Sequence, residues 1–190
     1  MGLTVVKLGG SLGASGRLHR VLEALGRCRA APLVIVPGGG EYADAVRACQ
    51  RRDGFSDGAA HEMALLAMQV FGRAIADLLP GAALVTKLGD VGPSLDRGEV
   101  PVCAPVTEIL AAALPASWDF TSDSIAAWVA VRLRADRLVL VKSGSRHSSR
   151  DPRELADAGV VDPLFPRFAS LVACPILIVG VDDDFEGLFA

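Results

Sequence analysis

The chain has 190 residues, of which 51% are hydrophobic and 22% charged, and its formal net charge is -3 at pH 7. This balance is typical of one soluble globular domain with a substantial buried core, and it excludes a disordered chain. The charge leaves no basic footprint for nucleic acid, and no apolar run approaches the roughly 20 residues of a membrane span. The N-terminus enters a strand-like run at once, without the features of a signal peptide, so we expect a cytoplasmic protein.

Short runs rich in Val, Ile and Leu alternate with helical patterns along the chain. The runs do not alternate with polar residues, as expected of strands covered on both faces. The predicted strands are Thr4–Leu8, Leu33–Val36, Ala83–Thr86, Val100–Cys103, Leu138–Val141 and Ile176–Val179. The predicted helices are about Arg17–Arg29, Glu41–Arg52, Ala59–Leu79, Thr107–Leu114, Asp123–Leu133 and Pro152–Ala158. This alternation predicts an α/β fold with three layers, α/β/α, around a mostly parallel sheet.

The first two predicted strands both end in glycines, in TVVKLGGSLG and LVIVPGGGEYA. Glycine opens backbone N–H groups to a ligand, and a helix that starts just beyond adds partial positive charge, so each turn suits a phosphate. Both turns should lie at the carboxyl edge of the sheet, where ligands of such folds bind. Lys7 lies one residue inside the first strand and can carry an ammonium to this edge. One such turn alone is also typical of a tight strand-to-helix connection, but two turns with a lysine favour a phosphate site.

The sequence GGGEYA also fits the loose pattern GxGxxA of dinucleotide binding, which keeps an NAD(P)-dependent oxidoreductase as an alternative. The carboxylate expected roughly 20 residues further on, after a second strand, has no good candidate. A Walker GxxxxGK[ST] sequence is absent from the chain, so an ordinary P-loop enzyme is excluded.

Polar residues with metal-binding potential are scattered rather than clustered. The four cysteines are isolated and form no CxxC pair, which predicts reduced thiols. The three histidines have no metal-ligand spacing to one another or to the cysteines, so no metal site built by the protein is predicted. For His61, in the first turn of a long predicted helix, we favour a surface or capping role over a substrate contact.

The stretch WDFTSDSIAAWVA begins another helix, with Thr121 or Ser122 as its cap and Asp123 in its first turn. A carboxylate there is favoured by the helix dipole alone, which is one explanation for Asp123. In the other, Asp123 faces the glycine turns and holds a cationic side chain or a magnesium ion.

Four stretches in this order, VVKLGGSL, VIVPGGGEYADAVR, FTSDSIAAWVA and LVLVKSG, resemble the amino acid kinase family across essentially the whole chain. Within it, the chain resembles a short branch typified by a kinase of methanofuran-type cofactor synthesis, which acts on an aminomethyl-furanmethanol phosphate. The resemblance implies an amino acid kinase-like domain over residues 1–190, with about 1–135 on the phosphoryl-acceptor side and 136–190 on the nucleotide side. It implies a kinase that uses ATP and Mg2+ on a small anionic acceptor, best a phosphate monoester that becomes a diphosphate. A homo-oligomer is also expected.

The resemblance, read with the glycine turns, assigns roles to individual residues. The catalytic ones are Lys7, Asp123 and Arg167. The phosphate-binding ones are Gly9, Gly10 and Ser11 on the donor side and Gly38, Gly39 and Gly40 on the acceptor side. The nucleotide-binding ones are Lys142, Ser143 and Gly144, and weaker substrate contacts are Glu41 and Ser122.

Two features depart from the family pattern. The turn VKSGSRHSS stands where members commonly have a TDVDG-like turn, which puts the contacts to ribose and adenine in question. Arg167, in GVVDPLFPRF, stands where many members have a second catalytic lysine; a surface arginine is the other explanation. A non-catalytic member of the fold that binds a nucleotide or an oxyanion is the main alternative to a kinase, and the retained Lys7, Asp123 and glycine turns count against it.

Overall fold

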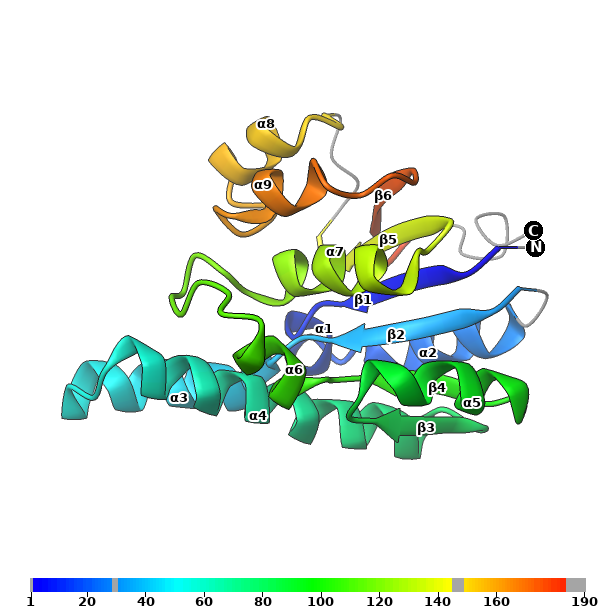
Figure 1. Ribbon diagram of the computed structural model, residues 1–190, viewed down its shortest axis with the longest axis horizontal. Coiled ribbons are helices and arrows are strands. Elements are labelled where there is room, and N and C mark those ends of the chain that lie inside the picture. Colours follow the sequence, from blue (N-terminus) through cyan, green and yellow to red (C-terminus); the bar gives the residue numbers. More distant parts are fainter. Residues whose placement is uncertain (1, 29–30, 145–148, 184–190) are drawn as a thin grey trace.

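A computed structural model describes residues 2–28, 31–144 and 149–183 of the chain. Its centre is a six-stranded sheet in the order β3-β4-β2-β1-β5-β6, and every neighbouring pair in it is parallel (Figure 1). The strands are β1 Thr4–Leu8, β2 Leu33–Pro37, β3 Ala82–Val85, β4 Val100–Cys103, β5 Arg137–Lys142 and β6 Ile176–Gly180. All six predicted strands are confirmed, with their bounds shifted by one residue at most, because each is a compact run of Val, Ile and Leu.

The six predicted helices also lie where the sequence places them. They are α2 Leu18–Arg27, α3 Gly40–Asp53, α4 Asp57–Leu78, α6 Val106–Ala111, α7 Ser122–Leu133 and α8 Pro152–Asp157. Four short elements were not predicted: α1 Ser11–Ala14, the 3-10 turn η1 Leu88–Asp90, α5 Val91–Asp96 and α9 Phe165–Ala169. Each has fewer than two helical turns, and α5 and α9 carry internal prolines, so periodicity gives little signal for them.

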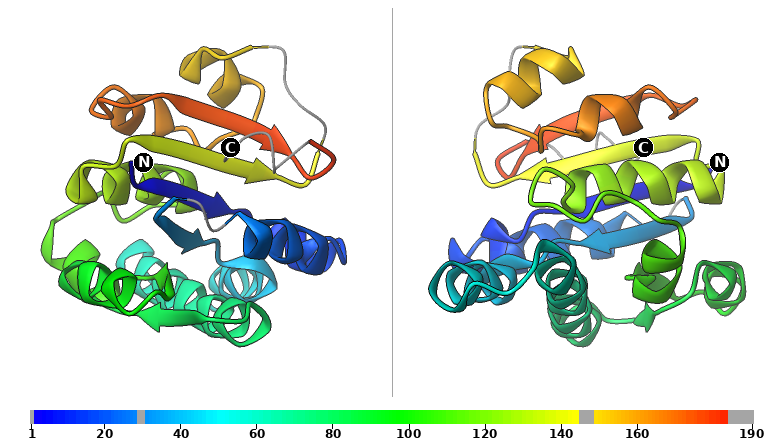
Figure 2. Two further views of the ribbon diagram at one scale, coloured as in Figure 1. Left: turned by 90° about the vertical axis from the view of Figure 1, so that its right-hand side faces the viewer. Right: turned by 60° about the vertical axis from the view of Figure 1, so that its left-hand side comes forward.

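Helices cover both faces of the sheet, as the two views of Figure 2 show. One apolar core joins Val5 of β1 and Leu140 of β5 to α7, α8 and α9. The other joins Val6 and Leu8 of β1 to α2 and the second half of α4. The predicted three-layer α/β/α architecture is therefore confirmed. In the described part of the chain, no helix has the length and apolarity to cross a membrane.

The two-residue period of a strand decides which way the lysine of β1 points. Val5 faces the core formed with α7, while Val6 and Leu8 face the core formed with α2. Lys7 has the same parity as Val5, so its side chain enters the layer that contains α7. This orientation brings the ammonium of a central strand to the first turn of α7.

Candidate active site

The two glycine turns lie directly against each other at the carboxyl edge of the sheet. Leu8 at the end of β1 pairs with Pro37 at the end of β2, and the N–H of Gly38 donates to the Leu8 carbonyl at 2.8 Å. A Cβ atom placed on Gly10 would lie 2.1 Å from the backbone nitrogen of Gly40, a separation that real Cβ atoms do not adopt. Gly40 itself has a φ of +56°, in the left-handed region that favours glycine. Glycine is thus required here for backbone-to-backbone packing.

This edge leaves backbone donors available to an anion. The N–H of Gly9 is used, because it donates to the Val141 carbonyl at 3.3 Å. Helix α3 begins at the second turn, and the first N–H groups of a helix have no intrahelical acceptor. Among the described residues of these two turns, the N–H groups without a backbone acceptor are those of Gly10, Ser11, Gly39 and Gly40. These donors and the glycine cradle fit the phosphates of a nucleotide.

Asp123 bridges two lysines in the interior beside the first turn. Its Oδ1 lies 2.8 Å from Lys7 Nζ, and its two carboxylate oxygens each accept from Lys142 Nζ at 2.7 Å. The side chains of Lys7 and Asp123 are each 6% exposed, and that of Lys142 is 16% exposed. Burial alone would raise the pKa of Asp123, but the two ammonium groups outweigh it and hold this pKa below its usual value. The carboxylate is therefore ionised at neutral pH.

The same surroundings favour the charged form of Asp123 but disfavour the charged form of Lys142. Burial, with the charge of Lys7 added, lowers the pKa of Lys142 to about 8 although Asp123 opposes the change. Asp123 does not fit as a magnesium ligand, since its carboxylate is occupied by ammonium groups. Across the described residues there is no group of three or more His, Cys, Asp or Glu side chains that could hold a metal ion.

Helix α7, which carries Asp123, is held at its start by Asp162. Its Oδ2 accepts from the N–H of Thr121 at 3.1 Å and from the N–H of Ser124 at 2.9 Å, and the carboxylate also accepts from both of their hydroxyls. Thr121, one of the two predicted caps, is the N-cap residue of α7, but its side chain makes no capping hydrogen bond to the helix. Asp162 is 7% exposed and was not singled out from the sequence. An aspartate inside the apolar run GVVDPLF was the available signal.

The expected nucleotide-side residues follow β5 at the same edge. Ser143 is tied to the first glycine turn, because Ser11 Oγ donates to Ser143 Oγ at 3.0 Å. Arg17 adds a second tie, donating to the Ser143 carbonyl at 2.7 Å. Gly144 is exposed beside them, while the rest of the polar turn, residues 145–148, lies outside the described residues.

Arg167 is not brought into the lysine cluster. It lies exposed on α9, with its guanidinium 5.9 Å from the ring centroid of Phe168. No hydrogen bond or ion pair joins it to Lys7, Asp123 or Lys142 in the described chain.

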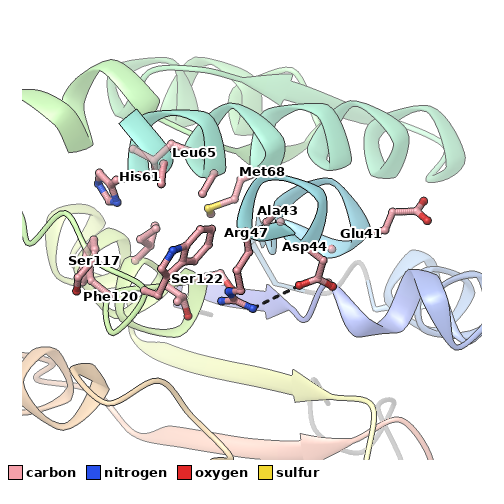
Figure 3. Close-up of a pocket in the computed structure, with 18 of the residues that line it drawn as sticks. Glu41, Ala43, Asp44, Arg47, His61, Leu65, Met68, Ser117, Phe120 and Ser122 are labelled. Carbon is pink, nitrogen blue, oxygen red and sulfur yellow. Dashed lines mark hydrogen bonds and ion pairs between the residues drawn. The ribbon is translucent and has the colours of Figure 1, made fainter. Parts of the chain in front are cut away.

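A pocket of about 340 Å³ opens beside the glycine turns, between α3, α4 and the segment before α7 (Figure 3). Gly10, Ser11, Gly39 and Gly40 of the two turns form part of its lining, and so does Ser122. The large apolar side chains of the lining are Leu65, Met68, Trp118, Phe120 and Ile125. Glu41 stands at the rim, and Figure 3 shows its carboxylate turned away from the other labelled side chains.

His61 corrects one expectation from the sequence. It is 8% exposed and lines the pocket, 6.1 Å from the ring of Phe120, rather than lying on the helix surface. Ser56 caps α4 instead, accepting from the N–H of Ala59. Burial lowers the pKa of His61, so the imidazole is neutral at pH 7.

Arg47 and Trp118 close one side of the pocket. The Arg47 guanidinium lies 4.3 Å from the ring centroid of Trp118, and Nη1 is 3.4 Å from Asp44 Oδ1. Trp118 Nε1 donates to Gln50 Oε1 at 2.6 Å, and Gln50 Nε2 donates to Asp57 Oδ1 at 2.8 Å. This chain of contacts fixes an aromatic wall and sets one cation and two carboxylates at the pocket.

Comparisons with known proteins agree with this geometry. The family model described as the amino acid kinase family matches residues 2–164. The chain is 27% identical over 166 residues to the [5-(aminomethyl)furan-3-yl]methyl phosphate kinase of Methanocaldococcus jannaschii, covering 86% of this chain and 68% of that protein.

Solved structures of uridylate kinases share the fold. The enzyme from Archaeoglobus fulgidus superposes with a TM-score of 0.71 at 16% identity, over 100% of this chain and 94% of the other. The enzyme from Ureaplasma parvum gives 0.70 at 15% identity, over 96% and 91% of the two chains.

Proposed function

The chain belongs to the amino acid kinase family and is a phosphotransferase; from this premise we propose that it transfers the γ-phosphoryl group of ATP to a small phosphate monoester, forming a diphosphate. The observation that carries the proposal is the pocket that ends on the paired glycine turns, next to the lysine cluster. Its volume of about 340 Å³ suits a small metabolite. Membership of this family also leaves the oxidoreductase alternative without support.

Phosphoryl transfer requires alignment and charge neutralisation more than covalent help from the protein. In the proposed reaction, an acceptor phosphate oxygen forms a bond to the γ-phosphorus while the bond to the β–γ bridging oxygen breaks, and ADP departs with that electron pair. Lys7 and the free N–H groups of Gly10 and Ser11 would neutralise the donor side. Gly39 and Gly40 would hold the acceptor side. A phosphate acceptor is already an anion and needs no general base.

The polar groups of the pocket support an acceptor that carries both kinds of charge. Arg47 offers a guanidinium, whose fork matches phosphate oxygens. Asp57, one helical turn before His61 on α4, adds a carboxylate to the lining of the pocket. A phosphate at the glycine end, an apolar ring in the middle and an ammonium near Asp57 would satisfy this arrangement. An aminomethyl-furanmethyl phosphate, the substrate class named for the archaeal relative, has these parts.

A panel of acceptors tests the proposal. ADP release is measured with [5-(aminomethyl)furan-3-yl]methyl phosphate and other phosphate monoesters, with carboxylates and with neutral alcohols. We expect turnover with phosphate monoesters, and a carboxylate that yields an acyl phosphate is the second candidate. Turnover restricted to neutral alcohols would contradict the proposal. ATP binding without consumption under every condition would favour the non-catalytic alternative.

Arg47 provides a matched pair of variants within one helix. Arg47→Met should lower kcat/KM for phosphate monoesters at least tenfold, because a charged hydrogen bond contributes about 1.5–3 kcal/mol. Arg51→Met, at an exposed position of the same helix, should leave it unchanged. Equal effects of the two variants would remove Arg47 from the acceptor site.

We also propose that the protein forms a homo-oligomer through α4. Met63, Leu66 and Val70 follow one another at helical spacing and are 40%, 46% and 51% exposed. A second copy would cover this apolar stripe. Light scattering should give a multiple of the 19.8 kDa chain mass for the wild type and a smaller mass for Leu66→Glu. A monomeric wild type would contradict the proposal.

A further inference from the structure

Lys142 reaches the reacting edge from a strand that is distant in sequence but adjacent in space. β5 pairs with β1 along its whole length, with Lys7 opposite Leu140. Lys142 follows Leu140 by two residues, so both lysines point into the layer that holds α7. A Cβ on Gly9 would lie 3.5 Å from Lys7 Nζ and 3.7 Å from Ser11 Oγ, which places the amine of Lys7 at the first glycine turn.

The two ammonium groups converge on one oxygen atom. Lys7 Nζ and Lys142 Nζ lie 2.8 Å and 2.7 Å from Asp123 Oδ1, so a single phosphoryl group can touch both. One carboxylate balances one of these two buried charges. The nearby Asp162 is engaged by the N–H and hydroxyl donors at the start of α7. The cluster therefore keeps positive charge for an anion at the sheet edge.

Residue choice points in the same direction. The chain has 19 lysines and arginines in total, and lysine occurs only at positions 7, 87 and 142 of the sequence. Two of these three lysines meet at Asp123. An ammonium is a compact point charge with three donors, which suits a corner that two cations share.

We propose that Lys142 is the second catalytic cation of this kinase, contacting the transferred phosphoryl group beside Lys7, in the role that the sequence assigned to Arg167. This rests on the proposed function. In the transfer step, the bond to the β–γ bridging oxygen breaks as the bond to the acceptor oxygen forms. Lys142 donates hydrogen bonds to the oxygens of the moving group and neither gives nor takes a proton. Asp123 positions both ammonium groups.

Nucleotide binding separates this role from the alternatives without any acceptor. The dissociation constants of Mg-ADP and of the Mg complex of the non-hydrolysable analogue AMPPNP are measured by calorimetry for the wild type and for Lys142→Met. Lys142→Met should bind ADP with a dissociation constant within about twofold of the wild-type value. The ratio of its AMPPNP to its ADP dissociation constant should rise about tenfold or more, because a charged hydrogen bond to the γ-phosphoryl group is lost. The fold should persist, because Asp123 keeps its pair with Lys7.

Steady-state kinetics and pH supply a second readout. Loss of one preorganised donor should lower kcat by about 10²-fold or more while the KM for ATP changes little. Lys142 faces Lys7 of β1, Asp123 of α7 and the nearby Asp162, and its pKa lies at about 8. Because the charged form is required, wild-type kcat/KM should fall as pH rises through this value. Lys142→Arg should retain part of kcat and lose that alkaline fall.

Controls make the possible outcomes distinct. Lys87→Met, at an exposed lysine outside the cluster, should behave as the wild type. Equal weakening of ADP and AMPPNP binding by Lys142→Met would make Lys142 a general nucleotide-binding residue. Wild-type dissociation constants for both nucleotides would make Lys142 a structural residue. Either result overturns the proposal. The proposal would also be overturned if the ratio of the AMPPNP to the ADP dissociation constant rose in Arg167→Met and not in Lys142→Met. A wild type that binds both nucleotides but phosphorylates no acceptor would sink the proposed function and leave the binding test of Lys142 intact. A wild type that binds neither would sink both.

Discussion

Replacing Asp123 by asparagine tests whether the buried cluster has the charges described above. The Asp123→Asn variant would keep the shape and one acceptor oxygen but leave two ammonium groups without a counter-charge. Removing one partner of a buried ion pair costs about 3–5 kcal/mol. Since Lys142 is partly exposed and already has a lowered pKa, we expect the lower end, about 3 kcal/mol. For a domain of this size that corresponds to a fall in Tm of about 6–12 °C.

Urea denaturation followed by circular dichroism at pH 7 measures this loss. Asp182→Asn is the matched control, because Asp182 pairs with Arg20 at 3.0 Å with both side chains about two-thirds exposed. That surface pair should contribute at most about 1 kcal/mol. A second test is the double variant Asp123→Asn, Lys142→Met, which should recover part of the stability because it removes one unpaired cation.

The pH dependence of the loss has a definite sign. The pKa of Asp123 is depressed in the folded protein, so its stabilisation is complete above the unfolded value of about 3.9 and is lost as pH falls through the folded value. The stability gap between wild type and Asp123→Asn should therefore shrink below about pH 4. A variant as stable as the wild type at pH 7 would refute the idea of a charged cluster.

The same contacts predict three further effects. Lys7→Met should lower kcat at least about 100-fold in an ADP-release assay while the circular dichroism spectrum is retained; near-normal turnover would contradict its role. Gly10→Ala should lower Tm and weaken AMPPNP binding, since its Cβ would lie 2.1 Å from Gly40 N, whereas Gly89→Ala, with no atom within 4 Å, should do neither. Asp162→Ala should lower the free energy of unfolding by about 2 kcal/mol and reduce kcat, because α7 loses the carboxylate that caps it. Asp119→Ala, at an exposed position, should change neither. An unaffected kcat in Asp162→Ala would show that this cap does not position Asp123.

The fold was largely predictable because its signals are local. Each strand is a short apolar run, and Gly10 and Gly40 mark where β1 and β2 end. Helix α5, VGPSLD, escaped prediction because glycine and proline within six residues hide its periodicity.

The site was less predictable because its contacts are long-range. Lys7, Asp123 and the glycine turns carry recognisable motifs, although their roles stay predictions. The partnership of Lys142 with Asp123 depends on β5 lying beside β1, which no local pattern encodes. Asp162 reaches Ser124 across 38 positions of sequence. His61 differs from expectation because the segment around Phe120 folds over it.

The strand order has a consequence for folding during synthesis. β1 is synthesised first yet lies in the middle of the sheet, between β2 and β5. At about 10 residues per second, on the order of ten seconds separate the synthesis of Lys7 from that of Lys142. During that interval one side of β1, which is buried along its whole length in the finished fold, has no neighbour, and Lys7 has no carboxylate partner until Asp123 is made. Until β5 is made, the nascent chain lacks Lys142 and leaves one edge of β1 without a neighbouring strand.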